Sequence, residues 1–298
     1  DWAVLRVGMR TDVGAQREVN EDAIDSRIYE RTGERRLGLF VVADGLGGQA
    51  SGEVASMLAV QQLWHAVYAD LWAPAMVGQP AERSPEDVLT AAALAADRAV
   101  AAARSERGND MSSTLVAALV LDSAVYIVNV GDSRAYRMRQ GRIEQFTQDH
   151  SLRQDLLHTG EVAPEDGFTV PENIITRSVG RDPEVTPDIF ELELEPGDQI
   201  LLCTDGLTRH VTDEELLSHS TQAQHPQRAV EDLVALANAR GGKDNITALL
   251  LRPGRAPRAT WLYTLWRILA LLILLAGLAW TAWRLLAPPA PEHPQGSQ

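Results

Sequence analysis

The stretch LGLFVVADG, Leu37–Gly45, decides which fold the rest of the chain is expected to adopt. Its apolar run 37–43 is typical of a buried strand. Asp44 and Gly45 follow at once, so the strand ends on a carboxylate in a turn. A carboxylate at the end of a buried strand is held rigidly at the edge of a sheet, where its oxygens can serve as ligands.

Acidic residues stand at or near strand ends in five places. These are Asn20–Asp22, Asp44–Gly45, Gly131–Ser133, Asp205–Gly206 and Asp244–Asn245. A single Asp-Gly pair is usually only a turn, but strand ends converge when the strands are neighbours in a sheet. Clustered carboxylate oxygens are the ligands that Mg²⁺ and Mn²⁺ prefer. The five motifs together therefore predict a cation site, although their spacing names neither the metal nor the reaction.

Arg17 lies five residues before Asp22 in the same segment. An isolated Arg is usually a solvated surface group. Beside a metal cluster, however, its planar guanidinium is suited to holding a phosphate through two parallel hydrogen bonds. Arg17 is therefore a candidate phosphate ligand.

The order of predicted elements favours an α+β fold. Helices are expected at 52–72, 84–107, 213–220 and 226–240, and strands at 37–43, 114–121, 124–130, 135–139, 142–146, 189–194, 199–204 and 245–251. Residues 160–188 lack periodicity and are predicted to form a long irregular loop, which in a compact domain is usually functional. Strands and helices do not alternate strictly, so helices outside antiparallel sheet are favoured over a parallel doubly wound sheet.

Charge is distributed unevenly along the 298 residues. The net charge is −14, of which residues 252–298 contribute +4 from five Arg and one Glu, so residues 1–251 carry −18. An acidic body of this kind is a poor nucleic-acid binder, because phosphate backbones require clustered Lys and Arg. The acidity is explained either by solubility or by carboxylates collected to hold cations. The single cysteine, Cys203, excludes an internal disulfide and is expected to be a buried strand residue.

In these residues the chain resembles the type 2C, or PPM, family of metal-dependent serine/threonine protein phosphatases, of the bacterial type. The motifs that carry the resemblance are Thr11–Ala23, Phe40–Ser56, Met111–Leu119, Val128–Arg137, Phe146–Ser151, Ile175–Gly180, Leu201–Leu207 and Asp244–Leu250. They occur in the family's order and cover about residues 5–251. The resemblance implies a four-layer α-β-β-α sandwich of two antiparallel sheets flanked by helices, with a binuclear metal centre at one end.

The resemblance also implies ligands for two Mn²⁺ or Mg²⁺ ions. Asp44 would bridge them, and Asp205 and Asp244 would complete the first site. The Gly45 carbonyl would serve the second site, together with Glu21 or Asp22, acting directly or through water. Asp22 is preferred, because bacterial relatives tend to keep that acid.

Three further roles follow from the same resemblance. Asp132 matches an acid tied to a third, weaker ion in bacterial members, and Arg17 matches the family's phosphate-binding arginine. Residues 150–182 match a mobile flap that shapes substrate access. Two departures stand out: Ser112 replaces a frequent Gly, and Leu46 stands where animal members have a His proposed as general acid. The proton donor for the leaving group is therefore open.

The implied activity is hydrolysis of phosphoserine and phosphothreonine on proteins by a metal-activated water. Two alternatives stay open: a phosphatase dedicated to a single regulatory protein or a small phosphate ester, and a catalytically weak pseudophosphatase scaffold. The expected partners are phosphoproteins, among them a membrane-bound Ser/Thr kinase and its substrates.

The C-terminal segment differs in kind from the acidic body. After a basic linker at 252–260, residues 261–284 are apolar except for Arg267 and Arg284, and four Trp flank the apolar centre, which predicts a single transmembrane helix. A buried or partner-binding helix is the alternative. Four Arg precede or begin the segment and one follows, so the inner or plasma membrane is expected, with the catalytic domain 1–251 in the cytoplasm. The Pro-rich tail 285–298 is expected to be disordered.

Overall fold

The computed structural model describes residues 4–30, 36–47, 51–163, 170–171, 174–181, 184–254 and 261–286. The chain divides into two compact units, Asp1–Gly254 and Arg255–Gln298. The first unit holds all the acidic motifs, and it ends three residues later than the catalytic domain predicted from the sequence.

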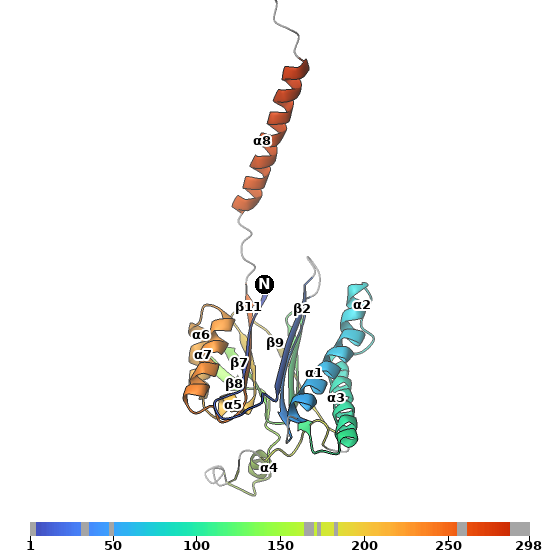
Figure 1. The fold of residues 1–298 in the computed structure, drawn as a ribbon, viewed down its shortest axis with the longest axis vertical. Coiled ribbons are helices and arrows are strands. Elements are labelled where there is room, and N and C mark those ends of the chain that lie inside the picture. Colours follow the sequence, from blue (N-terminus) through green and yellow to red (C-terminus); the bar gives the residue numbers. More distant parts are fainter. Residues whose placement is uncertain are drawn as a thin grey trace, which may run out of the picture. The chain divides into compact units, whose positions relative to one another are not determined.

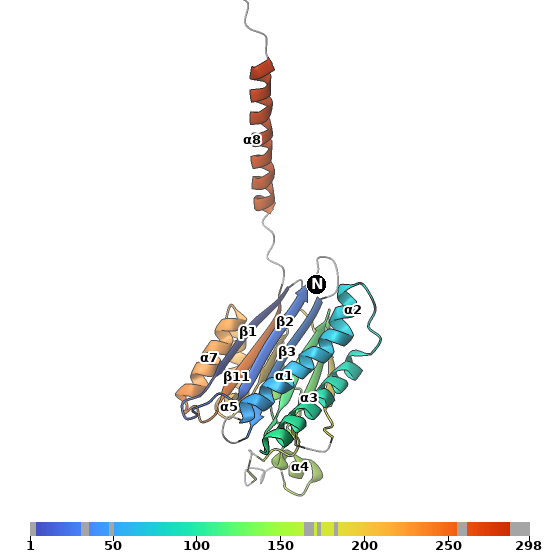
Figure 2. The same ribbon diagram turned by 45° about the vertical axis from the view of Figure 1, so that its right-hand side comes forward.

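Two antiparallel sheets form the centre of the first unit (Figures 1 and 2). One sheet has the order β1 (Val4–Asp12), β11 (Ile246–Gly254), β10 (Gln199–Cys203), β7 (Arg134–Arg139) and β8 (Arg142–Gln145). The other has the order β2 (Asp22–Glu30), β3 (Arg36–Leu46), β5 (Leu115–Leu121), β6 (Ala124–Val130) and β9 (Asp188–Glu193), with the short β4 (Ser112–Ser113) paired to β3. Neighbouring strands pair antiparallel throughout these two orders.

Helices cover the outer face of each sheet (Figure 1). One side carries α1 (Ser51–Val67), the π-helical turn η1 (Tyr68–Trp72), α2 (Ala73–Met76) and α3 (Pro85–Arg107). The other side carries α5 (Asp205–Thr208), α6 (Asp213–Gln222) and α7 (Pro226–Ala239). Helix α4 (Leu152–Thr159) lies at one end of the sandwich. The implied α-β-β-α layering is confirmed.

Strand β3 shows why the layers form. Its apolar residues are buried on both faces, because alternate side chains point to opposite sides of a sheet. Leu39 and Val41 pack among residues of α1 and α3. Phe40 and Val42 pack against residues of the opposite sheet, such as Ile200. The run 37–43 is therefore continuous in apolar residues, and it fixes two of the three core interfaces.

Several expectations need adjustment. The strands β1 and β2 and the helix α4 are not among the elements predicted from the sequence, and the helix expected over 52–72 changes to a π-helical turn after Val67. Strand β2 is at the edge of its sheet and reads DAIDSRIYE, which is too polar to predict as a buried strand. The helix predicted from the Ser84 cap does begin there, since the Ser84 side chain accepts a hydrogen bond from the Asp87 N–H.

The C-terminal unit contains helix α8 (Trp261–Leu286), where a transmembrane helix was expected over 261–284. Its side chains are described from Arg267 to Ala279, about 20 Å of helix at 1.5 Å per residue, against a hydrocarbon core of about 30 Å. Among the described residues, no helix has the length and apolar character needed to cross a membrane. The prediction of a transmembrane helix is corrected accordingly: the structure supports a helix here, but not a span.

The predicted linker and tail fall mostly outside the described residues. Residues 252–254 of the predicted linker belong to β11, whereas 255–260 are not described. In the predicted tail, 287–298 are not described either. Of the predicted flap 150–182, the structure describes α4 and residues 174–181. Ser151 and Ile175 form an isolated bridge within this region, and Val179 forms another with Ser113 of β4.

Candidate metal centre

The acidic motifs meet at one end of the sandwich. Asp22 opens β2 and pairs in register with Asp44 near the end of β3. Asp132 follows β6, Asp205 follows β10, and Asp244 precedes β11. Antiparallel pairing brings all of these strand ends to the same edge, so five carboxylates that are distant in sequence become neighbours.

Asp22 is buried beneath this edge and joins the two sheets. Its Oδ2 accepts hydrogen bonds from the hydroxyl of Thr204 at 3.0 Å and from that of Thr247 at 2.6 Å. Thr204 directly precedes Asp205, and Thr247 lies in β11 just after Asp244. The Asp22 carboxylate therefore fixes the backbone from which two other acids project.

Asp44 is held through hydrogen bonds of its backbone. Its N–H donates to the Thr114 hydroxyl at 2.8 Å, and its carbonyl accepts from the Thr114 N–H at 2.8 Å. The Thr114 hydroxyl in turn shares a 2.7 Å hydrogen bond with Ser133, next to Asp132. This chain of hydrogen bonds sets the spacing between the second and third acidic motifs.

Asp132 is positioned by a turn that His150 closes. The N–H of Gly131 donates to His150 Nδ1 at 3.0 Å, and the N–H of His150 donates to the Gly131 carbonyl at 3.0 Å. Nδ1 of His150 accepts here, and its Nε2 lies 3.0 Å from both Asp188 Oδ2 and Arg177 Nη1. Gly131 has a φ of +105°, and a Cβ there would clash with Thr114, so this turn requires glycine.

The clustered acids resist ionisation. Burial raises the pKa of Asp22 and of Asp132 to about 7, and that of Asp205 to about 6, from an ordinary value of 3.8. Burial also raises the pKa of Asp44 well above that value, and the charges of Asp22, Asp205, Asp132 and Asp244 raise it further. Such a set of mutually repelling carboxylates is costly unless positive charge is brought to it.

Two arginines supply positive charge in the structure. Arg17 Nη2 lies 2.8 Å from Asp244 Oδ1 and is half-exposed. Arg209, which caps α5, forms an ion pair with Asp205 one turn earlier and reaches Asp244 Oδ2 at 3.4 Å. The Asp244 carboxylate thus stands between two guanidinium groups.

Glu21 has a different role from its neighbour Asp22. Its Oε1 accepts a 3.0 Å hydrogen bond from the N–H of Gly52 at the start of α1, where a carboxylate also favours the helix dipole. Its carbonyl accepts from the N–H of Gly45 at 3.1 Å and from the Ser56 hydroxyl at 2.6 Å. Burial raises the pKa of Glu21. Glu21 therefore fixes the Gly45 backbone whether or not it also binds a cation.

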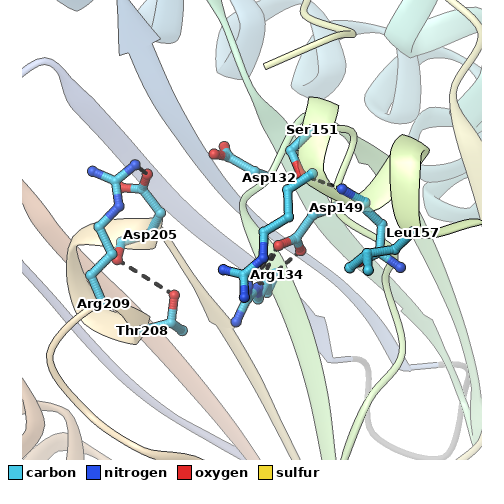
Figure 3. Close-up of a pocket in the computed structure, with 10 residues that line it drawn as sticks. Asp132, Arg134, Asp149, Ser151, Leu157, Asp205, Thr208 and Arg209 are labelled. Carbon is cyan, nitrogen blue, oxygen red and sulfur yellow. Dashed lines mark hydrogen bonds and ion pairs between the residues drawn. The ribbon is translucent and has the colours of Figure 1, made fainter. Parts of the chain in front are cut away.

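A cavity of about 300 Å³ opens over the cluster. Among the residues that line it are Arg17, Glu21, Asp44, Gly45, Leu46, Asp205, Arg209 and Asp244. Six of the eight site residues predicted from the sequence thus face one space, while Asp22 lies buried beneath it. Asp132 lines an adjacent cavity of about 340 Å³, which shares Asp205 and Arg209 with the first (Figure 3).

The donor set fits divalent cations. Asp22, Asp132 and Asp205 each keep a buried Oδ1 with no hydrogen-bond partner, an arrangement that costs free energy unless a proton or a cation is bound there. Hard oxygen ligands of this kind suit Mg²⁺ and Mn²⁺. Within the described residues, no group of three or more His, Cys, Asp or Glu side chains forms a ready ligand set. Threonine and arginine side chains are the present partners of Asp22, Asp205 and Asp244.

The sequence did not reveal the residues that support the acids. Thr114, Thr204, Thr247 and His150 lie beside the acidic motifs, but their roles depend on contacts between distant segments. Arg209 also escaped notice. A signal was present, because it stands four residues after Asp205 at the start of a helix, the spacing that pairs side chains on one helix face.

Comparison with known proteins agrees with this geometry. Residues 14–250 match the family model described as Protein phosphatase 2C. The chain is 36% identical over 249 residues to a Listeria welshimeri protein named serine/threonine phosphatase stp, and the match covers 83% of this chain and 95% of that protein.

Solved structures agree as well. The Mycobacterium tuberculosis serine/threonine phosphatase PstP/Ppp is 33% identical, with a TM-score of 0.71, covering 85% of this chain and 100% of that one. A catalytic domain of PstP in complex with 2 manganese ions is 34% identical, with a TM-score of 0.68, covering 83% of this chain and 97% of that one. The two-sheet sandwich, the sequence match over most of the first unit and the clustered acids lead to one conclusion: the chain belongs to the protein phosphatase 2C family.

Proposed function

We propose that the edge of the sandwich that carries the five acids hydrolyses phosphoserine and phosphothreonine residues in proteins. The observation that carries the proposal is the set of buried, partnerless oxygens on Asp22, Asp132 and Asp205, which surround Asp44 next to the candidate phosphate ligand Arg17. The relatives named serine/threonine phosphatase support the same reaction, and two Mn²⁺ or Mg²⁺ ions are its cofactors.

The proposed metal ligands follow from where the side chains lie. Asp44 faces the centre of the cluster, so it is suited to bridging two ions, with Asp205, Asp244 and the Gly45 carbonyl completing the sites. Glu21 lines the cavity and Asp22 lies beneath it, so both stay candidates for the remaining position. Asp132 is the candidate for a third ion. When bound, the ions supply a nucleophilic water at neutral pH and neutralise charge on the phosphoryl oxygens.

Arg17 is proposed to bind the substrate phosphate. It lines the same cavity as Asp44 and Asp205, and its present partner is Asp244, a proposed metal ligand. A cation on Asp244 would compete for that carboxylate and leave the Arg17 guanidinium to pair with phosphate oxygens instead. Leu46 also lines the cavity but carries no ionisable proton, so the leaving-group proton comes from another source.

The proposal also covers the binding partners of the protein and its location in the cell. Phosphoproteins are the substrates that this site chemistry implies, and a Ser/Thr kinase and its targets are the proposed partners. A membrane location, with the catalytic domain on the cytoplasmic side, is also a proposal. Its support is the apolar surface of α8, whose large side chains from Ile268 to Leu275 are exposed in the structure, because exposed apolar patches mark protein or membrane contacts.

Replacing Asp44 or Asp205 by Asn should remove catalysis. Each change removes a carboxylate charge at the centre of the cluster. Loss of a residue that only hydrogen-bonds to a metal ligand costs about 10- to 100-fold in metal affinity or activity. Loss of a ligand itself should cost at least as much. We expect Mn²⁺-dependent turnover of p-nitrophenyl phosphate to fall by at least about 100-fold. Asp70→Asn is the control, because Asp70 is a partly exposed residue of η1 that pairs with Arg83. Near-full activity in either cluster variant would contradict the metal assignment.

Replacing Arg17 by Ala should weaken phosphate binding. The side chain would no longer donate charge-assisted hydrogen bonds, each worth about 1.5–3 kcal/mol, so kcat/KM for a phosphothreonine peptide should fall about 10- to 100-fold. Arg83→Ala removes an exposed arginine that pairs with Asp70 and serves as the control. An unchanged kcat/KM for Arg17→Ala would remove Arg17 from the phosphate site.

The metal-free protein should lose stability as pH rises. The pKa values of Asp22, Asp132 and Asp205 are raised from 3.8 to about 7, 7 and 6, so the folded state binds more protons than the unfolded state between about pH 4 and pH 7. The free energy of unfolding then falls through that interval. In chelator, the Asp22→Asn substitution should therefore raise Tm more at pH 8 than at pH 5. The difference should be several degrees, because each kcal/mol of free energy of unfolding shifts Tm by about 2–4 °C.

Added Mn²⁺ should reverse the same destabilisation, since a ligand that binds only the folded state raises its stability. Thermal unfolding with and without chelator at pH 8 measures this effect in the wild-type chain. Two results would count against a cation site at the cluster: a Tm that Mn²⁺ does not change, or an increase in Tm on Asp22→Asn that is the same at both pH values.

Cell fractionation tests the proposed location. We expect the full chain in the membrane fraction and a chain ending at Gly254 in the soluble fraction, because the second unit contains the exposed apolar residues of α8. A full chain that stays soluble without detergent would refute a membrane location.

A further inference from the structure

Two aliphatic side chains line the cavity proposed to hold the scissile phosphate, and neither has a role in the proposed hydrolysis. Leu46 is the last residue of β3, and Ile175 belongs to the described segment 174–181. Among the described residues that line this cavity, the others are charged side chains, two glycines and Asn245. The cavity therefore has an apolar part in addition to its ionic part.

These two side chains do not belong to the hydrophobic core. Leu46 and Ile175 are both partly exposed. The three core clusters in the described part of the chain, together with the partly buried side chains packed against them, include neither residue. Apolar side chains stabilise a fold by leaving water, and these two do so only in part. They are therefore placed to bury apolar surface of a ligand that enters the cavity.

Backbone hydrogen bonds on both sides of Ile175 hold it at the cavity. The N–H of Leu152 donates to the Ile174 carbonyl at 2.8 Å. The N–H of Thr176 donates to the His150 carbonyl at 2.9 Å. Because the backbone of Ile175 is fixed in this way, contact with a ligand would order little additional chain, and the entropic cost of that contact is small.

The short strand β4 connects Leu46 to the same framework. Leu46 pairs with Ser112 of β4. The next residue, Ser113, exchanges two backbone hydrogen bonds with Val179, of 3.0 and 2.8 Å. Val179 lies in the same described segment as Ile175. Strand β4 therefore fixes the spacing between two aliphatic side chains that come from distant parts of the chain.

The chemistry of the cavity determines which part of a substrate these side chains contact. In the proposed function, carboxylates bind the cations and Arg17 binds the phosphate, whereas aliphatic carbon offers neither charge nor a hydrogen bond. The apolar pair is therefore suited to an apolar part of the phosphopeptide. The methyl group of phosphothreonine is too small to cover a leucine and an isoleucine side chain together, so a larger apolar group is needed.

We propose that Leu46 and Ile175 form a subsite for an apolar side chain of the phosphopeptide, at the residue directly before or after the phosphorylated one. The subsite rests on the proposed phosphatase function and adds a sequence preference to it. The position follows from chain length: each residue of an extended peptide spans about 3.3–3.6 Å, and the two side chains line the same cavity as the candidate phosphate ligand Arg17. Leu46 and Ile175 are thus specificity-determining residues.

Phosphothreonine peptides that differ at one position test the subsite. The residue directly before or after the phosphothreonine is Leu, Ala or Asn, and kcat/KM is measured for the full-length enzyme in Mn²⁺. Asn has as many side-chain heavy atoms as Leu but is polar, so it separates apolar contact from size. For the wild type, kcat/KM should be about five- to tenfold higher with Leu than with Ala or Asn at one of the two positions, because each buried methylene favours binding about fourfold and the subsite covers the Leu side chain in part.

Substitution of the two aliphatic residues should change this preference. Ile175→Ala and Leu46→Ala should each lower the Leu-to-Ala ratio of kcat/KM to about twofold or less, whereas Ile175→Leu conserves the apolar volume and should retain most of the ratio. Ile174→Ala is the matched control and should keep the whole ratio, because Ile174 is 42% exposed and is not among the residues that line this cavity. A ratio taken between two peptides within one variant cancels any general loss of activity or folded protein.

Two results would overturn the subsite and leave the phosphatase function intact. One is a wild-type chain that hydrolyses the Leu, Ala and Asn peptides with equal kcat/KM at both positions. The other is a Leu-to-Ala ratio in Ile175→Ala and Leu46→Ala that equals the wild-type ratio. A wild-type chain that hydrolyses none of the peptides in Mn²⁺ is a different failure, because it would overturn the phosphatase function itself and the subsite with it.

Discussion

Mutual repulsion among five clustered carboxylates is the constraint on which the functional end of this protein depends. The five come from separate strand ends: Asp22, Asp44, Asp132, Asp205 and Asp244. The other four all raise the pKa of Asp44, and burial also raises the pKa values of Asp22, Asp132 and Asp205. A fold that gathers such groups must hold them in place against that repulsion. The two sheets do so because antiparallel pairing sets one edge for all five.

Hydrogen bonds from threonines and ion pairs with arginines together hold this cluster. Threonines fix the backbone, as when Thr204 and Thr247 both donate to Asp22 and so tie β2 to the opposite sheet. Arginines at the rim neutralise Asp205 and Asp244. The threonine contacts are independent of any cation, whereas the arginine contacts are with the acids that cations would use. The same guanidinium groups are therefore placed to turn from the protein's own carboxylates to the anions of a substrate.

The sequence predicted the acids well, because an apolar run followed by Asp-Gly is a local pattern, as in 37–45. It could not predict the partners of Asp22, since Thr204 and Thr247 are separated from it by 182 and 225 residues. It missed β2, whose half-polar residues suit an edge strand, and α4, an eight-residue helix that directly precedes the irregular region 160–188. Hydropathy alone predicted a membrane span near the C-terminus, and within the described residues no helix meets that requirement.

Direct titration with metal ions tests most directly whether the five acids form a metal centre. Isothermal calorimetry of Mn²⁺ into chelator-stripped protein at pH 8 should give two ions per chain, as in the related structure that holds two manganese ions. Asp44→Asn should lose this binding, because Asp44 is the proposed bridge between the sites. Heat for two ions that persists unchanged in Asp44→Asn, or a wild-type chain that binds none, would contradict a metal centre at the five-carboxylate edge.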